Sequence, residues 1–344
     1  MAVGEMRALV LARYGGADAA ELRQVARPQV EADQVLVQVH AVGLNPVDYK
    51  IRQGELRILY RFRLPCVLGN ELAGVVTEIG AAVTRFKQGD RVMARVAKHR
   101  MGAFAEYAAV EESFVAHVPD DVPLDVAAGV PLAGLTAMQI LRDELAVSAA
   151  QKVLVTGGAG GVGTFAIQLA KAFGCPVITT ASPRGAALVT SLGADLVLDY
   201  TSGELERLHA EVDAVFDTVG GTGLDAAIRA AKPGAKLVTV NGPVEPKTAL
   251  VDLERGLLLA ALFWLVSFRI RGLARRHGVK YRYFFMHPSG DDLAQLAAML
   301  EAGELRVIID RVFPFEQITD ALAYLQGGRA KGKVVVRLRE EVRG

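Results

Sequence analysis

Cysteine is scarce in this chain of 344 residues. Cys66 and Cys175 are its only cysteines, and they lie far apart in sequence and form no C-x-x-C pair. A disulfide framework is therefore excluded, and a reducing compartment is expected. Residues 1–14 also lack the apolar core and the small-residue cleavage site of a signal peptide. We therefore expect a cytoplasmic protein.

Neither sign of charge dominates, and no apolar run reaches membrane-spanning length. Lysine and arginine number 39 against 38 for aspartate and glutamate, so the net charge of +1 gives no electrostatic reason for nucleic-acid binding. The longest apolar run, residues 256–268, is shorter than the roughly 20 residues that cross a bilayer. It is followed by Arg269, Arg271, Arg275 and Arg276. We favour a helix packed on its own domain or on a partner subunit, while a helix on an anionic membrane surface stays open.

A glycine-rich turn stands where a dinucleotide would bind. Residues 152–156 are typical of a buried strand and residues 164–173 of an amphipathic helix. Between them, Gly158, Gly160 and Gly163 match G-x-G-x-x-G. The first glycine allows a tight turn, the second lets a pyrophosphate approach the backbone, and the third lets helix and strand pack closely. The free N–H groups of the helix start, which includes Gly161 and Val162, would face the phosphates.

Acidic residues are missing where NAD specificity would require one. A unit that binds NAD places an Asp or Glu about 20 residues beyond the turn, where it accepts from the ribose 2′-hydroxyl. Residues 164–194 contain none, and the second strand runs into Ala181-Ser182-Pro183-Arg184. A hydroxyl and a guanidinium suit a 2′-phosphate. We therefore predict NADP(H), the alternative being that Arg184 is a solvated residue opening the next helix.

Length and a hydrophobic content of 51% predict two domains. The first third is rich in β-structure, and from Leu124 onward strands alternate with helices, which is typical of a parallel, doubly wound sheet. A capping box at Ser289 predicts a helix through Leu300. Strands are expected at residues 7–11, 35–42, 71–79, 91–94 and 104–110, then at 152–156, 176–180, 194–199, 214–217, 236–241 and 281–286, and in the tail at 306–315 and 333–338 around a helix at 316–325.

Several motifs follow one another along the whole chain. They are GLNPVDYK at residues 43–50, GNELAGVV at 69–76, PLAGLTA at 131–137, the glycine turn, SLGAD at 191–195 and GKVV at 332–335. In this order they resemble the medium-chain dehydrogenase/reductase superfamily, in its zinc-free quinone oxidoreductase and enone reductase branch. The resemblance implies an α/β fold with a doubly wound Rossmann NADP(H)-binding domain over residues 125–287. It also implies a β-rich, GroES-like catalytic domain over residues 1–124 and 288–344.

The chain departs from the zinc alcohol dehydrogenases of this superfamily at the metal ligands. Those enzymes have a cysteine at the position of Asn45, a histidine followed by glutamate at Asn70-Glu71, and a four-cysteine lobe. A catalytic zinc needs about three His, Cys or carboxylate ligands. The six histidines here show no H-x-x-x-H pairing. We therefore predict no metal.

The resemblance implies hydride transfer from NADPH to an acceptor that is already electrophilic, a quinone or an α,β-unsaturated carbonyl. Asn45 and Lys50 lie in the loop that adjoins the nicotinamide in this family, and they are candidates for stabilising the developing oxyanion. Tyr49 is a candidate proton relay. The alternatives are a Lys50 that bonds a cofactor phosphate or ribose, a solvated Lys50, and a Tyr49 that only packs. The alternative function is an NADPH-binding sensor or assembly protein with little turnover, or a membrane-associated reductase.

The resemblance also implies cofactor contacts and an oligomeric state. Carried over by match, the contacts are Gly134 and Thr136 near the nicotinamide ribose, Ser182, Arg184 and Tyr200 around the 2′-phosphate, Asn241 and Gly242 beside the nicotinamide, Phe284 and Phe285 at the carboxamide, and Lys333 from the tail. For Lys333 a place beside a β-strand is an equal alternative. Edge pairing of Rossmann sheets in this family implies a homodimer.

Overall fold

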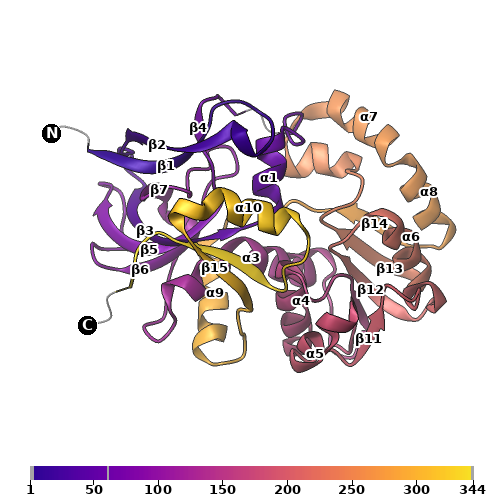
Figure 1. The fold of residues 1–344 in the computed structure, drawn as a ribbon. Coiled ribbons are helices and arrows are strands. Elements are labelled where there is room, and N and C mark those ends of the chain that lie inside the picture. The colour runs from indigo at the N-terminus through magenta and orange to yellow at the C-terminus, as the bar shows by residue number, and fades with distance from the viewer. Residues whose placement is uncertain (1–3, 60–61, 342–344) are drawn as a thin grey trace. The chain divides into compact units, whose positions relative to one another are not determined.

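The computed structural model describes residues 4–59 and 62–341. The chain divides into two compact units, one of Met1–Leu135 with His287–Gly344 and one of Thr136–Met286. The first unit therefore extends past the boundary expected at Leu124. The reason lies in the packing of residues 124–127, which form a short helix against two strands of the first unit. Figure 1 shows the elements of both units.

The first unit is built on antiparallel β-structure. One sheet has the order β15-β16-β3-β5-β6-β8, with β7 also pairing with β3, and a smaller sheet has the order β2-β1-β4. A large apolar core lies in this unit, with fully buried side chains such as Phe104, Leu72 and Phe315, beside a smaller cluster around Met6 and Val10. The strands are β1 (Glu5–Leu11), β2 (Ala20–Ala26), β3 (Gln34–Leu44), β4 (Cys66–Val67), β5 (Glu71–Ile79), β6 (Arg91–Arg95), β7 (Tyr107–Glu111), β8 (Val115–His117), β15 (Ile309–Pro314) and β16 (Lys333–Arg337).

The helices of the first unit begin and end at residues with clear capping roles. Helix α1 (Pro46–Gln53) has Pro46 in its first turn and ends at Gly54, whose φ of 80° suits glycine. Helix α9 (Gly290–Glu301) begins after Ser289, whose hydroxyl accepts from the Asp292 N–H, as the capping box predicted. The others are α2 (Leu124–Ala127), α10 (Ile318–Gln326), the 3₁₀ turns η1 (Ala17–Ala19), η2 (Glu112–Phe114) and η6 (Phe315–Gln317), and α3 (Pro131–Gln139), which runs across the unit boundary.

The second unit is a parallel sheet of the doubly wound type. Its six strands have the order β11-β10-β9-β12-β13-β14, and every pair in it is parallel. The order reverses next to β9, which leads into the glycine turn, so the site predicted there lies where ligands bind in such sheets. The strands are β9 (Val153–Val155), β10 (Val177–Ala181), β11 (Leu196–Asp199), β12 (Val212–Asp217), β13 (Ala231–Thr239) and β14 (Lys280–Tyr283).

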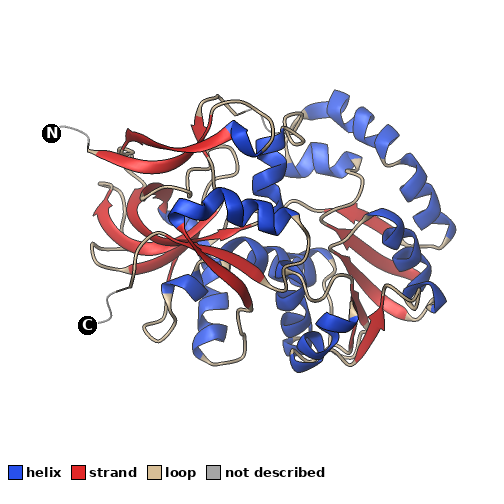
Figure 2. Ribbon diagram, viewed as in Figure 1, coloured by secondary structure: helices blue, strands red, loops and turns tan. Residues whose placement is uncertain are grey.

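Helices connect these strands (Figure 2). They are α4 (Gly161–Ala172), α5 (Pro183–Ser191), α6 (Gly221–Ala230), α7 (Gly256–Val266) and α8 (Phe268–Arg276), with the shorter turns η3 (Ile140–Glu144), η4 (Leu205–Arg207) and η5 (Thr248–Asp252). Together with the β-rich first unit, this architecture confirms the predicted α/β fold class.

Some details differ from the sequence-based expectation. Strands β2, β4 and β8 were not predicted, because β2 is mostly polar and the other two have only two or three residues. The sixth strand of the Rossmann sheet is present but ends at Tyr283 and not at Met286. Phe284 and Phe285 therefore follow the strand and lie beyond its carboxyl end.

The apolar run does form a helix, α7, but that helix is not packed on its own unit. Leu257 and Leu258 are 79% and 91% exposed, and of the helix only Ala260 and Phe263 are buried. Packing on its own domain, one of the two alternatives expected, therefore holds only for these two buried side chains, and packing on a partner subunit stays a prediction. Within the described residues no single helix has the length and apolar character to cross a membrane. The pair α7 and α8, bent by 64° where they meet, passes that test only when taken together.

Candidate active site

The glycine turn of the second unit has the geometry that its three glycines predict. A Cβ on Gly158 would overlap the hydroxyl oxygen of Thr179, and a Cβ on Gly163 would overlap the carbonyl oxygen of Gly157. Both positions therefore require glycine for packing within the protein. A Cβ on Gly160 would meet only the Gly157 oxygen, at 3.3 Å. This second glycine is therefore less crowded than the other two, although its one contact is close, and the fingerprint expects a pyrophosphate at this position.

The N-terminus of α4 lies next to the glycine turn. Gly161 and Val162 are partly exposed, while Gly163 is buried against the turn. The first N–H groups of a helix have no partner within the helix, and they carry its partial positive charge. The Gly160 N–H donates to the Gly157 carbonyl at 3.0 Å, so the N–H groups of Gly161 and Val162 are the candidates for contact with a diphosphate.

Asp217, at the carboxyl end of β12, holds the neighbouring loops in place. Its carboxylate is fully buried and accepts from the hydroxyls of Thr156 and Thr239, at 2.6 Å each. It also accepts from the backbone N–H of Gly220, at 3.0 Å. These bonds tie together the ends of β9, β12 and β13. The sequence analysis did not name Asp217; an aspartate that ends a strand and precedes a Gly-Gly pair was the available signal.

The residues predicted for the 2′-phosphate follow two adjacent strands. Ala181 at the end of β10 pairs with Asp199 at the end of β11, so Ser182 and Tyr200 follow these two ends directly. Ser182 precedes the first turn of α5, and Arg184 is exposed in that turn. Tyr200 is also exposed. The sheet therefore brings the three predicted side chains to one corner of its carboxyl edge.

The predicted residues Asn241, Gly242, Phe284 and Phe285 follow the carboxyl ends of β13 and β14. The Asn241 side chain donates to the Val219 carbonyl at 2.8 Å, and the space around Gly242 is closed by Tyr281 and Thr239. The Phe284 ring is buried, and its N–H donates to the Thr239 carbonyl at 3.0 Å. Phe285 is partly exposed, and its ring packs on Tyr283 with 5.1 Å between centroids. Thr136 is buried in α3.

The first unit contains a buried cluster of polar side chains around Lys333. The Lys333 ammonium is 2% exposed and donates to the Leu44 carbonyl at 3.1 Å, to Asn45 Oδ1 at 2.6 Å and to Glu71 Oε1 at 2.7 Å. An ammonium has three N–H donors, so these three acceptors match its full capacity. The Asn45 amide also donates to Glu71 Oε1 at 2.6 Å. We refer to Asn45, Asp48, Asn70, Glu71 and Lys333 as the buried polar cluster.

Asp48 and Asn70 extend this cluster toward α1. The Asp48 carboxylate accepts from the Asn45 N–H at 2.7 Å and from the Asn70 amide at 2.6 Å. The first contact caps the N-terminus of α1. Burial raises the pKa of Asp48 from 3.8 to about 7, against the opposing effect of these two hydrogen bonds.

The Glu71 carboxylate connects the buried polar cluster to the neighbouring backbone. Glu71 Oε2 accepts from the Leu132 N–H at 2.5 Å, near the start of α3, the helix that also contains Gly134. A Cβ on Gly43 would overlap Glu71 Oε1. The glycine of the GLNPVDYK motif is therefore required by the close approach of the buried carboxylate.

Tyr49 and Lys50 lie in α1, next to the cluster in sequence. Both side chains are partly exposed. Burial raises the pKa of the Tyr49 phenol, so this group stays protonated at neutral pH and is available as a hydrogen-bond donor. Asn45, in contrast, uses both ends of its amide within the cluster.

The donor set at the positions of the zinc ligands does not fit a zinc ion. Asn45 and Asn70 are neutral amides, and the ammonium of Lys333 lies 2.7 Å from Glu71, the one carboxylate at these positions. Zinc is bound by thiolates, imidazoles and carboxylates. Throughout the described ranges, no three His, Cys, Asp or Glu side chains are grouped so that they could hold a metal ion.

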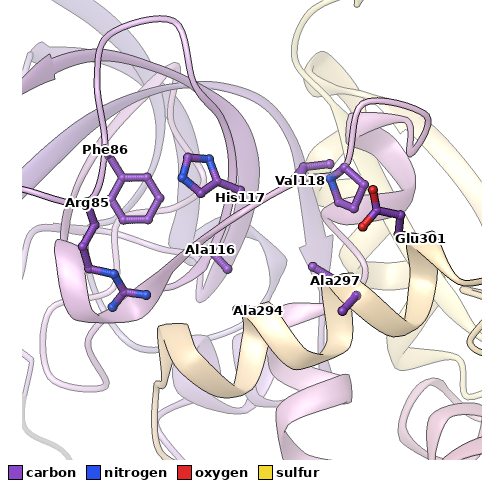
Figure 3. A pocket seen from close by; sticks show the side chains of 10 residues that line it. Arg85, Phe86, Ala116, His117, Val118, Ala294, Ala297 and Glu301 are labelled. Atoms are coloured by element: carbon purple, nitrogen blue, oxygen red, sulfur yellow. The ribbon is translucent and has the colours of Figure 1, made fainter.

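A hollow elsewhere in the first unit does not coincide with these residues. It has a volume of about 370 Å³ and lies between β8 and α9, where Phe86 and His117 stack with 4.7 Å between ring centroids (Figure 3). Arg85 and Glu301 stand at its two ends. None of the predicted site residues lines it, so we assign it no part in the chemistry.

Comparisons with known proteins identify the family. Residues 31–120 match the model of the alcohol dehydrogenase GroES-like domain, and residues 192–336 match that of a zinc-binding dehydrogenase domain. An NADPH-dependent alkenal/one oxidoreductase of Arabidopsis thaliana is 38% identical over 96% of this chain and 79% of its own length. The chain belongs to the medium-chain dehydrogenase/reductase superfamily. This confirms the resemblance seen in the sequence, within the quinone and enone oxidoreductase branch.

Solved structures of this superfamily agree with the fold of the whole chain. The quinone oxidoreductase of Coxiella burnetii has a TM-score of 0.84 and 30% identity, over 98% of this chain and 100% of its own. A mycobacterial protein solved in complex with NADPH has a TM-score of 0.80 and 29% identity, over 97% of this chain and 100% of its own. The family model named for zinc binding indicates shared descent and not a zinc site. At the positions of the zinc ligands this chain has residues of the buried polar cluster.

Proposed function

We propose that this chain is an NADPH-dependent reductase that transfers a hydride to a quinone or an α,β-unsaturated carbonyl without a metal. The observation that carries the proposal is the less crowded second glycine of the turn at the switch point of a parallel sheet. Relatives named for NADPH-dependent alkenal/one reduction, 2-methylene-furan-3-one reduction and quinone reduction support the class of acceptor.

The preference for NADP(H) depends on one corner of the sheet. Ser182, Arg184 and Tyr200 follow the ends of β10 and β11, and residues 164–194 contain no carboxylate to bond a ribose 2′-hydroxyl. A guanidinium presents a planar fork of donors to a phosphate. We assign the 2′-phosphate to these three side chains.

Bound NADPH supplies the hydride, and the protein supplies orientation and stabilisation of charge. We assign Lys50 and Tyr49 to hydrogen-bond the oxygen on which negative charge develops. Tyr49 serves as a donor, since its raised pKa keeps the phenol protonated. We reassign Asn45 and Lys333 from direct contact with substrate or cofactor to positioning, because their polar atoms bond within the buried polar cluster.

The test is NADPH oxidation by the purified protein against a panel of quinones and enones, with NADH in parallel. We expect turnover with NADPH and a clear preference over NADH. Binding of NADPH without turnover on any acceptor would favour the alternative of a sensor or assembly protein. The best acceptor in the panel defines the substrate class.

The variant Arg184→Ala tests the phosphate corner. The ratio of kcat/KM for NADPH to that for NADH should fall roughly 10- to 100-fold, since a hydrogen bond to a charged group contributes about 1.5–3 kcal/mol. Arg207→Ala, an exposed arginine of the same unit, is the matched control and should leave the ratio unchanged. An unchanged ratio in Arg184→Ala contradicts the assignment.

We further propose a homodimer in a reducing compartment, the cytoplasm being our expectation. Strand β14 is an edge of the Rossmann sheet, and pairing of this edge with a second copy would cover its backbone groups. Both thiols, Cys66 and Cys175, are unpaired in the structure. Light scattering on the purified protein measures the oligomeric state.

A further inference from the structure

Many of the exposed large apolar side chains of the second unit belong to α7. Figure 1 shows α7 and α8 as a bent pair on the outer side of this unit, with α7 away from the strands. We call the exposed side chains of this segment the apolar arm. They are Leu257, Leu258, Leu262, Trp264, Leu265, Val266 and Phe268. Contiguous apolar surface of this kind marks a site of contact with a protein or a membrane.

The apolar arm is held by a rigid base. Ser267, at the bend, is buried and donates to the Phe263 carbonyl at 2.6 Å. Beyond the bend, Ile270 and Ala274 pack into the core of the second unit. On the other side, Asp252 forms an ion pair of 2.5 Å with buried Arg282 of β14. Both ends of the segment that contains α7 are therefore fixed to the second unit, while the side chains of the apolar arm are exposed.

Within residues 255–290, which contain the apolar arm, every charged side chain is basic, and exposed Glu254 directly precedes this stretch. Residues 255–290 contain no Asp or Glu, whereas α8 contains Arg269, Arg271, Arg275 and Arg276. Arg275 and Arg276 are exposed, and Arg271 lies over the Trp264 ring at 5.6 Å from its centroid. Asp225 of α6 pairs with Arg269 at 2.8 Å and offsets one of these charges. An apolar helix followed by arginines complements a surface with apolar depth and anionic headgroups.

The same charge disfavours a second copy of this chain as the occupant. A two-fold interface sets identical patches against each other. The arginines of α8 would then approach those of the partner, and residues 255–290 supply no carboxylate to neutralise them.

The chain segment between β13 and β14 also sets the location of the apolar arm. Helix α7 lies in the segment that leaves the carboxyl end of β13 and returns to β14. Asn241 and Gly242 begin this segment, and by the rule for parallel sheets the cofactor binds at that edge. The segment that starts beside the proposed nicotinamide site therefore contains the apolar arm.

We infer that the apolar arm and the arginines of α8 dock the protein on an anionic lipid surface, from which it takes membrane-dissolved acceptors such as long-chain quinones. The second clause rests on the proposed reductase function, and the first does not. Trp264 and the leucines enter the headgroup boundary, and Arg275 and Arg276 contact lipid phosphates.

Flotation with vesicles tests the docking. Vesicles of equimolar phosphatidylglycerol and phosphatidylcholine should carry the protein, and vesicles of phosphatidylcholine alone should not. Leu258→Glu/Leu265→Glu should abolish flotation. Arg275→Gln/Arg276→Gln should weaken partitioning about 25-fold, since each basic residue near an anionic surface contributes about fivefold, and should reduce its dependence on salt.

Matched control variants distinguish an effect of the apolar arm and of the α8 arginines from a general effect of changed surface charge. Ile79→Glu/Leu196→Glu places the same charges at exposed apolar residues elsewhere, and Lys87→Gln/Arg329→Gln removes the same charge from other exposed positions. Both controls should float like the wild type. Equal loss in the controls, or flotation that ignores the phosphatidylglycerol content, overturns the proposal. So does a wild-type dimer that Leu258→Glu/Leu265→Glu converts to a monomer in the absence of vesicle binding, which would make the apolar arm a subunit interface.

Activity measurements keep this proposal distinct from the reductase proposal. With a water-soluble enone and no vesicles, the apolar-arm variants should have unchanged kcat/KM. With a long-chain quinone in anionic vesicles, they should lose at least tenfold. A protein that floats but reduces nothing contradicts the reductase function and leaves docking supported.

Discussion

The buried polar cluster of the first unit and the carboxyl edge of the second unit are both rich in polar groups, but they use them differently. In the cluster, Lys333, Asn45 and Glu71 bond to one another and to the backbone away from water. At the sheet edge, the buried Asp217 binds the loops, while Arg184, Tyr200 and the backbone at Gly161 face outward. Groups whose bonds are completed within the protein position the structure, and groups directed to solvent are those available to a ligand.

The largest effect is expected from removing the cation of the buried polar cluster. Lys333→Met leaves the Glu71 carboxylate buried without its partner, which costs about 3–5 kcal/mol. The free energy of unfolding in urea measures this loss. The double variant Lys333→Met/Glu71→Gln should recover part of it, since the uncompensated charge is gone. If the double variant is no more stable than the single one, Lys333 does not act by neutralising Glu71.

Variants of two glycines in the same turn distinguish an effect on packing from an effect on ligand binding. Gly158→Ala should destabilise the protein by about 1–3 kcal/mol, because its Cβ would overlap Thr179. Gly160→Ala should change stability by less than about 0.5 kcal/mol but should weaken NADPH binding about tenfold, because its methyl group occupies the space expected for a pyrophosphate. Urea unfolding and fluorescence titration with NADPH measure the two effects. Unweakened binding by Gly160→Ala contradicts the assigned phosphate position.

The effect that is smallest per pH unit is a slope of stability with pH. The pKa of Asp48 is about 7 in the folded protein, above its ordinary value of 3.8. Between these values the folded state retains a proton that the unfolded state has released, so this group makes stability fall as pH rises, by at most about 1.4 kcal/mol per pH unit. Above pH 7 the penalty stays constant, and below pH 3.8 it is absent.

The variant Asp48→Asn isolates this slope. Its free energy of unfolding, measured in urea between pH 5 and pH 8 (about the range in which Asp48 titrates), should lack the contribution of Asp48. The difference in stability between the variant and the wild type should therefore shift in favour of the variant as pH rises. A difference independent of pH shows that Asp48 is ionised over the whole range.

The sequence by itself determined the order of the elements, the parallel sheet and the glycine turn. These features depend on local patterns, since alternation of apolar residues defines strands and a glycine is needed wherever a Cβ would overlap the backbone. Ser289 as a helix cap and the sixth strand of the Rossmann sheet were predictable for the same reason.

Only the tertiary structure decided which polar residues belong together. Lys333 is far from Asn45 and Glu71 in sequence, and the pairing of β16 with β3 brings it next to them. Likewise, the sequence of α7 indicated a helix but not which of its side chains are covered, because apolar periodicity is the same for a buried face and an exposed one. Burial depends on what packs against a helix, and that is a property of the fold and not of the helix itself.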